Sequence, residues 1–162
     1  MNVRALFRYP LQTPYPAIVG DIAKRLADAR IAGARLVIDQ TGVGRPVFDL
    51  FSQVGLRPVG ITITGGSDFS WVEMSQFRVA KILLVSVMQS LLHAGEIKIA
   101  KSLPDAATLV SELQDFRANI SESGYASFGA RSGKHDDLVL AVAIGAWWLL
   151  RARPGETRVQ TF

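Results

Sequence analysis

The sequence predicts an α/β domain with a mainly parallel central sheet flanked by helices. Segments with a helical period of apolar residues alternate along the chain with short apolar runs that are typical of strands. One of these runs, Arg35–Asp39, is apolar up to a final carboxylate, as expected of a buried parallel strand that ends at a ligand-binding edge. The 162 residues are 49% hydrophobic and 20% charged, which is enough apolar material for a single buried core.

The first half of the chain is predicted to form two helices and three strands. Apolar residues alternate with others over Val3–Tyr9, which favours a strand. Pro16 suits the first turn of a helix, and the helical spacing after it runs to a stop at Gly33. After Arg35–Asp39, a turn with glycines leads into a short helix over 46–55 and then into the strand Val59–Thr64.

The second half begins with a loop at Gly65–Asp68, to which the pattern assigns no element. The elements predicted after it are a helix over Val79–His93, a strand over Ile97–Ile99, a helix over Asp105–Phe116, a hairpin over Ile120–Arg131 that turns at Ser123-Gly124, and a last helix that starts at Asp136 or Asp137. We take 1–150 as the domain and 151–162 as a polar tail.

Composition excludes several classes of protein. The longest apolar run, Leu138–Leu150, is flanked by charges and is too short to cross a bilayer, so a buried helix is expected and no membrane partner. The start of the chain does not have the pattern of a signal peptide. Cysteine is absent, which excludes disulfides and thiolate metal sites and suits a cytoplasmic protein. The net charge of +4 favours a polyanionic partner only weakly.

Asp39 is the first candidate for chemistry. A carboxylate at the C-terminal end of a buried strand lies where open α/β sheets place their ligands. Gly42 and Gly44 then allow the backbone to turn sharply and to approach a substrate. The alternative is an aspartate that only accepts hydrogen bonds from the amides of its own turn.

Asp136 and Asp137 are the second candidate. One aspartate before a helix usually caps it, whereas two in succession point about 100° apart and repel each other unless a cation lies nearby. A hard divalent cation held by carboxylate oxygens would supply that charge. His135, directly before them, could position a nucleophilic water or join the metal shell, and it could equally be a loop residue.

Three segments together resemble a known family. The turn Asp39-Gln40-Thr41-Gly42-Val43-Gly44-Arg45-Pro46, the strand Val59–Thr64, and Gly133-Lys134-His135-Asp136-Asp137-Leu138 before an Ala-rich helix resemble the nuclease domain of phage terminase large subunits. The order of elements is similar from Tyr15 to Trp148, which is most of the chain. The final His-Asp-Asp-Leu helix is the most specific part of this resemblance.

The resemblance implies a ribonuclease H-like fold, related to Holliday-junction resolvases, that cuts viral DNA in the host cytoplasm during genome packaging. It implies that Asp39 and Asp137 are metal ligands, with Asp136 as a helper, around Mg²⁺ or Mn²⁺. Two such ions would hydrolyse the phosphodiester bond, one by activating water and the other by stabilising the leaving oxygen. The implied partners are double-stranded DNA, the packaging ATPase domain, the portal and the small terminase subunit.

The sequence departs from the family at its start. The family places its leading metal-ligand aspartate on a first, central strand, but residues 1–20 contain no Asp or Glu, and the first acidic residue is Asp21. We therefore expect an N-terminally truncated version of the fold, with weak metal binding and reduced or absent activity in isolation. The missing strand would lie beside Arg35–Asp39, so we expect Val3–Tyr9, or a second copy in a homodimer, to cover that edge.

Two further interpretations stay open. The chain could be a resolvase-like nuclease acting on branched DNA or RNA–DNA hybrid, or a catalytically dead remnant that binds DNA or partner subunits. The basic residues Arg45, Arg131 and Lys134 could contact phosphates or could be solvated loop charges.

Overall fold

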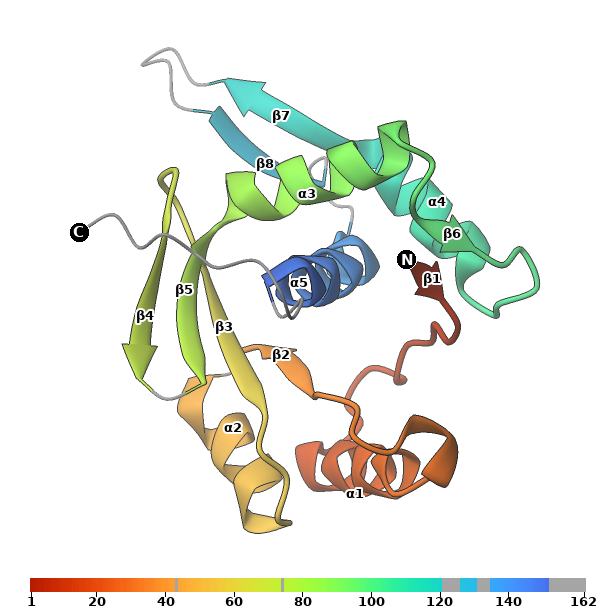
Figure 1. The fold of residues 1–162 in the computed structure, drawn as a ribbon, viewed down its shortest axis with the longest axis vertical. Coiled ribbons are helices and arrows are strands. Elements are labelled where there is room, and N and C mark those ends of the chain that lie inside the picture. Colours follow the sequence, from red (N-terminus) through yellow and green to blue (C-terminus); the bar gives the residue numbers. More distant parts are fainter. Residues whose placement is uncertain (43, 74, 121–125, 131–134, 152–162) are drawn as a thin grey trace.

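The computed structural model describes residues 1–42, 44–73, 75–120, 126–130 and 135–151, and it confirms the predicted α/β class (Figure 1). The elements are β1 (Asn2–Val3), α1 (Tyr15–Leu26), a 3₁₀ turn η1 (Ala29–Ile31), β2 (Val37–Asp39), α2 (Gly44–Gln53), β3 (Val59–Thr64), β4 (Phe69–Glu73), β5 (Gln76–Ala80), α3 (Lys81–His93), β6 (Lys98–Ile99), α4 (Ala106–Asp115), β7 (Phe116–Ile120), β8 (Ala126–Ala130) and α5 (Asp137–Arg151).

The central sheet has four strands in the order β2-β3-β5-β4. The pairs β2–β3 and β3–β5 are parallel, and β4 runs antiparallel to β5 at the outer edge, so the expected mainly parallel sheet is confirmed. Asp39 pairs with Ile61, and Thr64 pairs with Ala80 further along. The carboxyl ends of the parallel strands therefore lie at the same edge, which is where α3 begins.

The β4–β5 hairpin was not predicted, because its first strand lacks a pattern. All five residues of β4 are exposed, so no buried face repeats at every second position. Another small hairpin, β7–β8, agrees with the one predicted near 120–131, although it begins at Phe116. Its proposed turn at Ser123-Gly124 lies outside the described residues.

The prediction of a strand over Val3–Tyr9 is wrong. Only Asn2–Val3 is a strand, and it pairs in parallel with β6 instead of with the main sheet. The burial also runs against the predicted alternation, because Leu6 is buried while Ala5 and Phe7 on either side are exposed. Leu6 packs in a small apolar cluster with residues of α4 and α5, so one anchoring side chain holds this segment in place of a hydrogen-bonded ladder.

Two predicted helix boundaries also change. The first helix ends at Leu26, not near Gly33, because Asp28 accepts a hydrogen bond from the backbone N–H of Arg30 and starts the 3₁₀ turn. The helix predicted over Val79–His93 begins at Lys81, because its first two residues complete β5. Of the tail predicted over 151–162, Arg151 is the last residue of α5, and 152–162 lie outside the described part of the chain.

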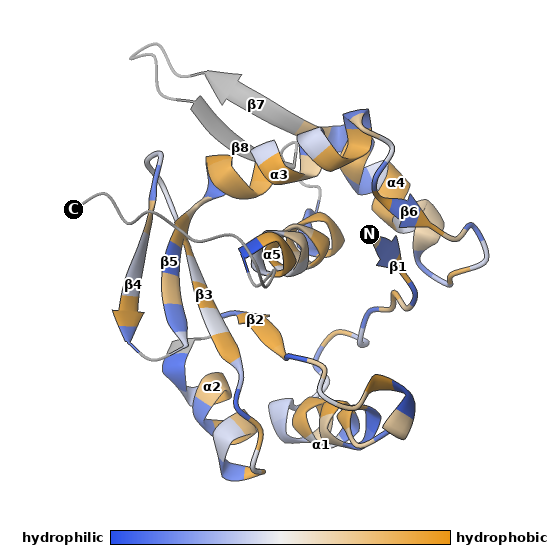
Figure 2. Cartoon of the chain, in the orientation of Figure 1, coloured by the Kyte–Doolittle hydropathy of each residue, from blue (hydrophilic) through white to orange (hydrophobic). Residues whose placement is uncertain are grey.

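Helix α5 lies at the centre of the fold. It lies between the sheet and α3 in Figure 1, and Figure 2 shows apolar residues along α3 and α5. The largest apolar cluster joins sheet, α3 and α5, and its buried members are Ile61, Val79, Leu84, Met88, Leu91, Ile97, Ala143, Ile144, Ala146 and Trp147. Side chains in β2 alternate accordingly: Val37 packs on this cluster, and Ile38 packs on the cluster that α1 and α2 form across the sheet.

Within the part of the chain that the structure describes, no helix is both long enough and apolar enough to cross a membrane.

Candidate metal centre

Asp39 is the last residue of β2 and is exposed. Its Oδ1 accepts a hydrogen bond from the backbone N–H of Thr41 at 2.8 Å and another from the Thr41 hydroxyl. Thr41 Oγ1 in turn accepts the backbone N–H of Ile63 in β3 at 2.8 Å. Thr41 thus ties the Asp39 carboxylate to the neighbouring strand, a role that the sequence reasoning did not assign to it. The alternative given for Asp39, a hydrogen bond from an amide of its own turn, is therefore present, and this bond is made to Oδ1.

Asp136 and Asp137 stand at the start of α5, but their side chains are not the acceptors for the backbone N–H groups of Leu138 and Val139. The backbone N–H groups of Leu138 and Val139 donate instead to Glu112 Oε2, at 2.9 and 3.1 Å. Glu112 comes from α4 and is only 6% exposed, so a buried carboxylate from another helix caps α5. The capping explanation for the aspartate pair is therefore not needed at these two amides.

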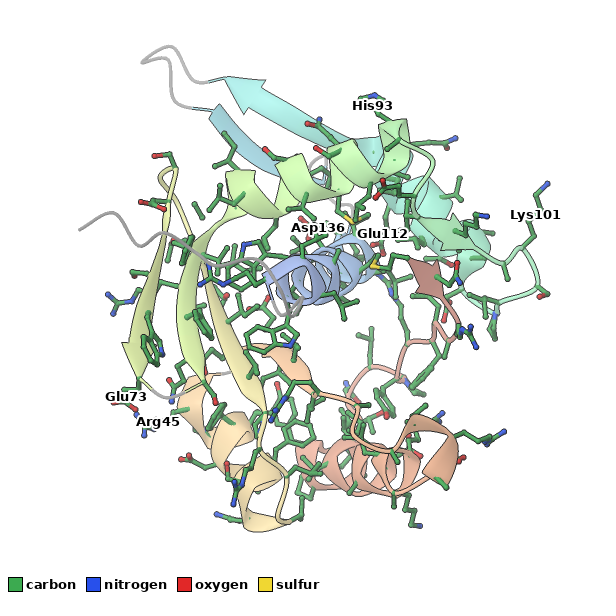
Figure 3. All side chains as sticks on the ribbon, viewed as in Figure 1. Arg45, Glu73, His93, Lys101, Glu112 and Asp136 are labelled. Atoms are coloured by element: carbon green, nitrogen blue, oxygen red, sulfur yellow. The ribbon has the colours of Figure 1, made fainter. Side chains whose placement is uncertain are left out.

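Asp136, directly before α5, and Asp137, its first residue, are called the α5 aspartates below, and each pairs with a cation from a distant part of the chain. Asp136 Oδ2 lies 2.9 Å from Nζ of Lys81, the first residue of α3, and both side chains are largely covered. Asp137 Oδ2 lies 3.2 Å from a guanidinium nitrogen of Arg8, and the Asp137 side chain is 70% exposed. The same Arg8 nitrogen also forms an ion pair with Glu112. Figure 3 labels Glu112 and Asp136 beside α5.

Of the other predicted site residues, His135 lies beside Asp137, whereas Arg45 pairs with a residue of β4. His135 Nδ1 lies 3.9 Å from Asp137 Oδ2, and both side chains are exposed. Arg45 lies at the start of α2 and pairs with Glu73 at 3.7 Å. Figure 3 shows that pair well apart from Asp136. Arg131 and Lys134 lie outside the described residues, so their predicted phosphate contacts stay predictions.

The chemistry of these groups suits a hard cation, since Asp39, Asp136 and Asp137 supply carboxylate oxygens. Among the residues that the structure describes, however, no three His, Cys, Asp or Glu side chains are gathered as a ready-made metal cage. Asp39 is oriented by Thr41, and the two α5 aspartates are oriented by Lys81 and Arg8.

Open α/β sheets bind their ligands at the carboxyl ends of the strands, and Asp39 lies at such an end. No family model matches the chain, and no curated protein matches it. Solved structures do match, and the matches include three crystal structures of the large terminase nuclease from thermophilic phage G20c. The first has a TM-score of 0.60 at 22% identity and covers 82% of this chain.

The other two hold bound cobalt and bound magnesium. They match with TM-scores of 0.62 and 0.58 at 21% identity, and each covers 83% of this chain. The chain thus shares the fold of these structures over most of its length, and the predicted α/β class with a mainly parallel sheet is confirmed. It spans only 61–62% of the length of these structures.

Proposed function

We propose that this chain is a divalent-metal-dependent endonuclease domain of terminase type that hydrolyses phosphodiester bonds of double-stranded DNA. The observation that carries the proposal is the fold shared with the large terminase nuclease over 82–83% of the chain, including a structure of that protein with magnesium and another with cobalt. The carboxylates at the end of β2 and the start of α5 are the groups that such chemistry requires.

In this proposal Asp39 and Asp137 are the ligands, and Asp136 assists. Mg²⁺ or Mn²⁺, when bound as a pair, would lower the pKa of the attacking water and stabilise the leaving oxygen. The Thr41 hydroxyl would hold the Asp39 carboxylate in place, because the same hydroxyl accepts the backbone N–H of Ile63. His135, whose Nδ1 lies 3.9 Å from Asp137 Oδ2, would orient the water, and Arg45, Arg131 and Lys134 would contact DNA phosphates.

Further partners are implied by the resemblance to terminase large subunits. A terminase nuclease in the host cytoplasm would act together with a packaging ATPase domain, a portal and a small terminase subunit. We propose these as the partners of the full assembly.

A second function, a non-catalytic DNA- or partner-binding remnant, is favoured by one observation. Asp136 and Asp137 are already paired with Lys81 and Arg8, and no three His, Cys, Asp or Glu side chains among the described residues are gathered to hold a metal ion. Such a chain would retain DNA binding and lack cleavage. A resolvase-like nuclease would differ in its preference for branched DNA or RNA–DNA hybrid.

Mn²⁺ titration with plasmid cleavage as the readout separates these functions. We expect weak Mn²⁺ binding by calorimetry and slow nicking of plasmid, and we expect Asp39→Asn and Asp137→Asn to remove most of both, because a neutral amide is a poorer ligand for a hard cation. Asp49→Asn, an exposed change on α2 with the same loss of charge, is the matched control. Equal Mn²⁺ affinity in wild type and Asp39→Asn would count against this site.

A gel shift of DNA without cleavage would support the non-catalytic binding function, and faster cutting of a four-way junction would support the resolvase-like function.

A further inference from the structure

We infer that Lys81 and Arg8 are resident counter-cations of the α5 aspartates, and that they set the metal affinity of this domain by competing with the divalent ion. This inference rests on the proposed function, because it concerns the same carboxylates. It assigns a role to two residues that the sequence analysis did not single out.

Lys81 is held close to Asp136 by its surroundings. It begins α3 directly after β5, its Nζ lies 2.9 Å from Asp136 Oδ2, and it lies 5.6 Å from the centre of the Phe116 ring. The Lys81 and Asp136 side chains are only 24% and 21% exposed. Limited access to water weakens the screening between these charges, so the ammonium neutralises much of the negative charge that a metal would need.

Arg8 is fixed by contacts that do not involve Asp137. Its backbone N–H donates to Asp105 Oδ2 at 3.0 Å, and its guanidinium pairs with Glu112. Glu112 is buried and also caps α5, so it cannot leave without uncovering the amides of that helix. Arg8 therefore stays beside Asp137 even when the exposed Asp137 carboxylate turns toward another cation.

The consequence is a site in which a divalent ion meets positive charge already in place. A dication that binds Asp137 would lie within roughly 5 Å of the retained guanidinium. Glu112 offsets part of that positive charge, so the remaining repulsion in water lowers affinity by about threefold to tenfold at low salt. A dication that recruits Asp136 has to displace the Lys81 ammonium. Removing either cation should therefore tighten metal binding, which is the opposite of what the loss of a purely structural ion pair would do.

Mn²⁺ binding to the folded protein, measured by calorimetry and by the electron paramagnetic resonance signal of free Mn²⁺, tests this. We expect Lys81→Gln and Arg8→Gln each to bind Mn²⁺ roughly three- to tenfold more tightly than wild type at about 20 mM NaCl, with the gain shrinking toward about 300 mM. Arg30→Gln is the matched control, because it removes the same charge from an exposed pair with Asp28, and it should bind like wild type.

The outcomes separate this inference from the proposed function. Equal or weaker binding by Lys81→Gln, with binding by wild type intact, overturns the counter-cation role and leaves the nuclease proposal standing. No Mn²⁺ binding by any of these variants overturns both. Arg8→Gln leaves Glu112 buried without its partner, so thermal unfolding is measured alongside. If that variant does not fold, Lys81→Gln decides the question, because Glu112 takes no part in the Lys81–Asp136 pair.

Discussion

Glu112 Oε2 accepts the backbone N–H of Leu138 at 2.9 Å, which joins the middle of α4 to the first turn of α5 across 26 positions of the sequence. The other carboxylate oxygen of Glu112 pairs with Arg8, and Arg8 pairs with Asp137. One buried carboxylate thus fixes both the start of α5 and the cation beside a candidate metal ligand. The stability of the fold and the geometry of the proposed site depend on the same residue.

Replacement of Glu112 should be strongly destabilising. Glu112→Ala uncaps α5 and leaves Arg8 without its buried partner, so we expect a loss of about 2–3 kcal/mol in the free energy of unfolding. Glu112→Gln keeps a carbonyl oxygen for the amides and should cost about 1 kcal/mol. Urea unfolding followed by circular dichroism measures both. Gln114→Ala, an exposed change on the same helix, should stay within about 0.5 kcal/mol of wild type, and a Glu112→Ala protein as stable as that control would contradict the capping role.

Thr41 offers a second test, at the other end of the proposed site. Thr41→Val removes the hydroxyl that donates to Asp39 and accepts from Ile63, and it should cost about 1 kcal/mol because the Ile63 amide loses its acceptor. It should also weaken Mn²⁺ binding severalfold, because the backbone N–H of residue 41 alone then holds the Asp39 carboxylate. Thr41→Ser retains the hydroxyl and should restore both properties. If Ser and Val behave alike in calorimetry and urea unfolding, the hydroxyl has no positioning role.

The segment before α1 is attached through a titrating carboxylate. The Tyr9 hydroxyl donates to Asp21 Oδ2 at 2.7 Å, Arg25 Nε donates to the same oxygen at 2.7 Å, and these bonds hold the pKa of Asp21 below its ordinary value. A carboxyl whose pKa is lower in the folded state stabilises the fold above its unfolded pKa of about 4, and this contribution is lost as the pH falls through the folded pKa.

Thermal unfolding between neutral pH and about pH 2 checks this sign. Tyr9→Phe should lower the melting temperature slightly at neutral pH, and its difference from wild type should shrink below about pH 4. The effect is small because Asp21 is solvent-accessible. Tyr15→Phe, an exposed tyrosine at the start of α1, is the control and should show no such pH dependence. A Tyr9→Phe difference that grows in acid would mean that the bond acts mainly through the neutral carboxyl.

Local patterns predicted the elements that bury a regular face. The strand Val59–Thr64 has the predicted bounds, because a run of apolar and β-branched residues between turn residues is unambiguous. The exposed strand β4 has no such face and could not be recognised. The alternation over Val3–Tyr9 suggested a strand, but the packing of Leu6 against α4 and α5 decides its conformation.

The candidate site also shows that local sequence patterns do not predict contacts between distant residues. Asp39, Asp136 and Asp137 could be selected from the sequence, because a strand end and a helix start are local features. Their partners could not be selected in this way. Lys81 lies 55 positions from Asp136, and Arg8 lies 129 positions from Asp137. Only the folded chain brings these charges together, so their effect on a metal had no signal in one sequence.

The outer edge of β2 supports a last prediction, about association. The carbonyl of Leu36 and the amide of Gln40 bond to β3, so the backbone groups of Val37 and Asp39 between them face the opposite edge. No strand among the described residues pairs with that edge, so the expectation that Val3–Tyr9 would cover it is wrong. A half-buried strand with an open row of amides and carbonyls tends to recruit another strand.

We therefore expect a second copy of the chain to pair with the outer edge of β2, with light scattering giving the mass of a dimer. Val37→Pro removes one outward amide and should shift the protein toward monomer, because proline cannot donate to a ladder. Val54→Ala, an exposed apolar change directly after α2, is the control and should leave the mass unchanged. Wild-type protein that stays monomeric at high concentration would show that this edge is covered in some other way.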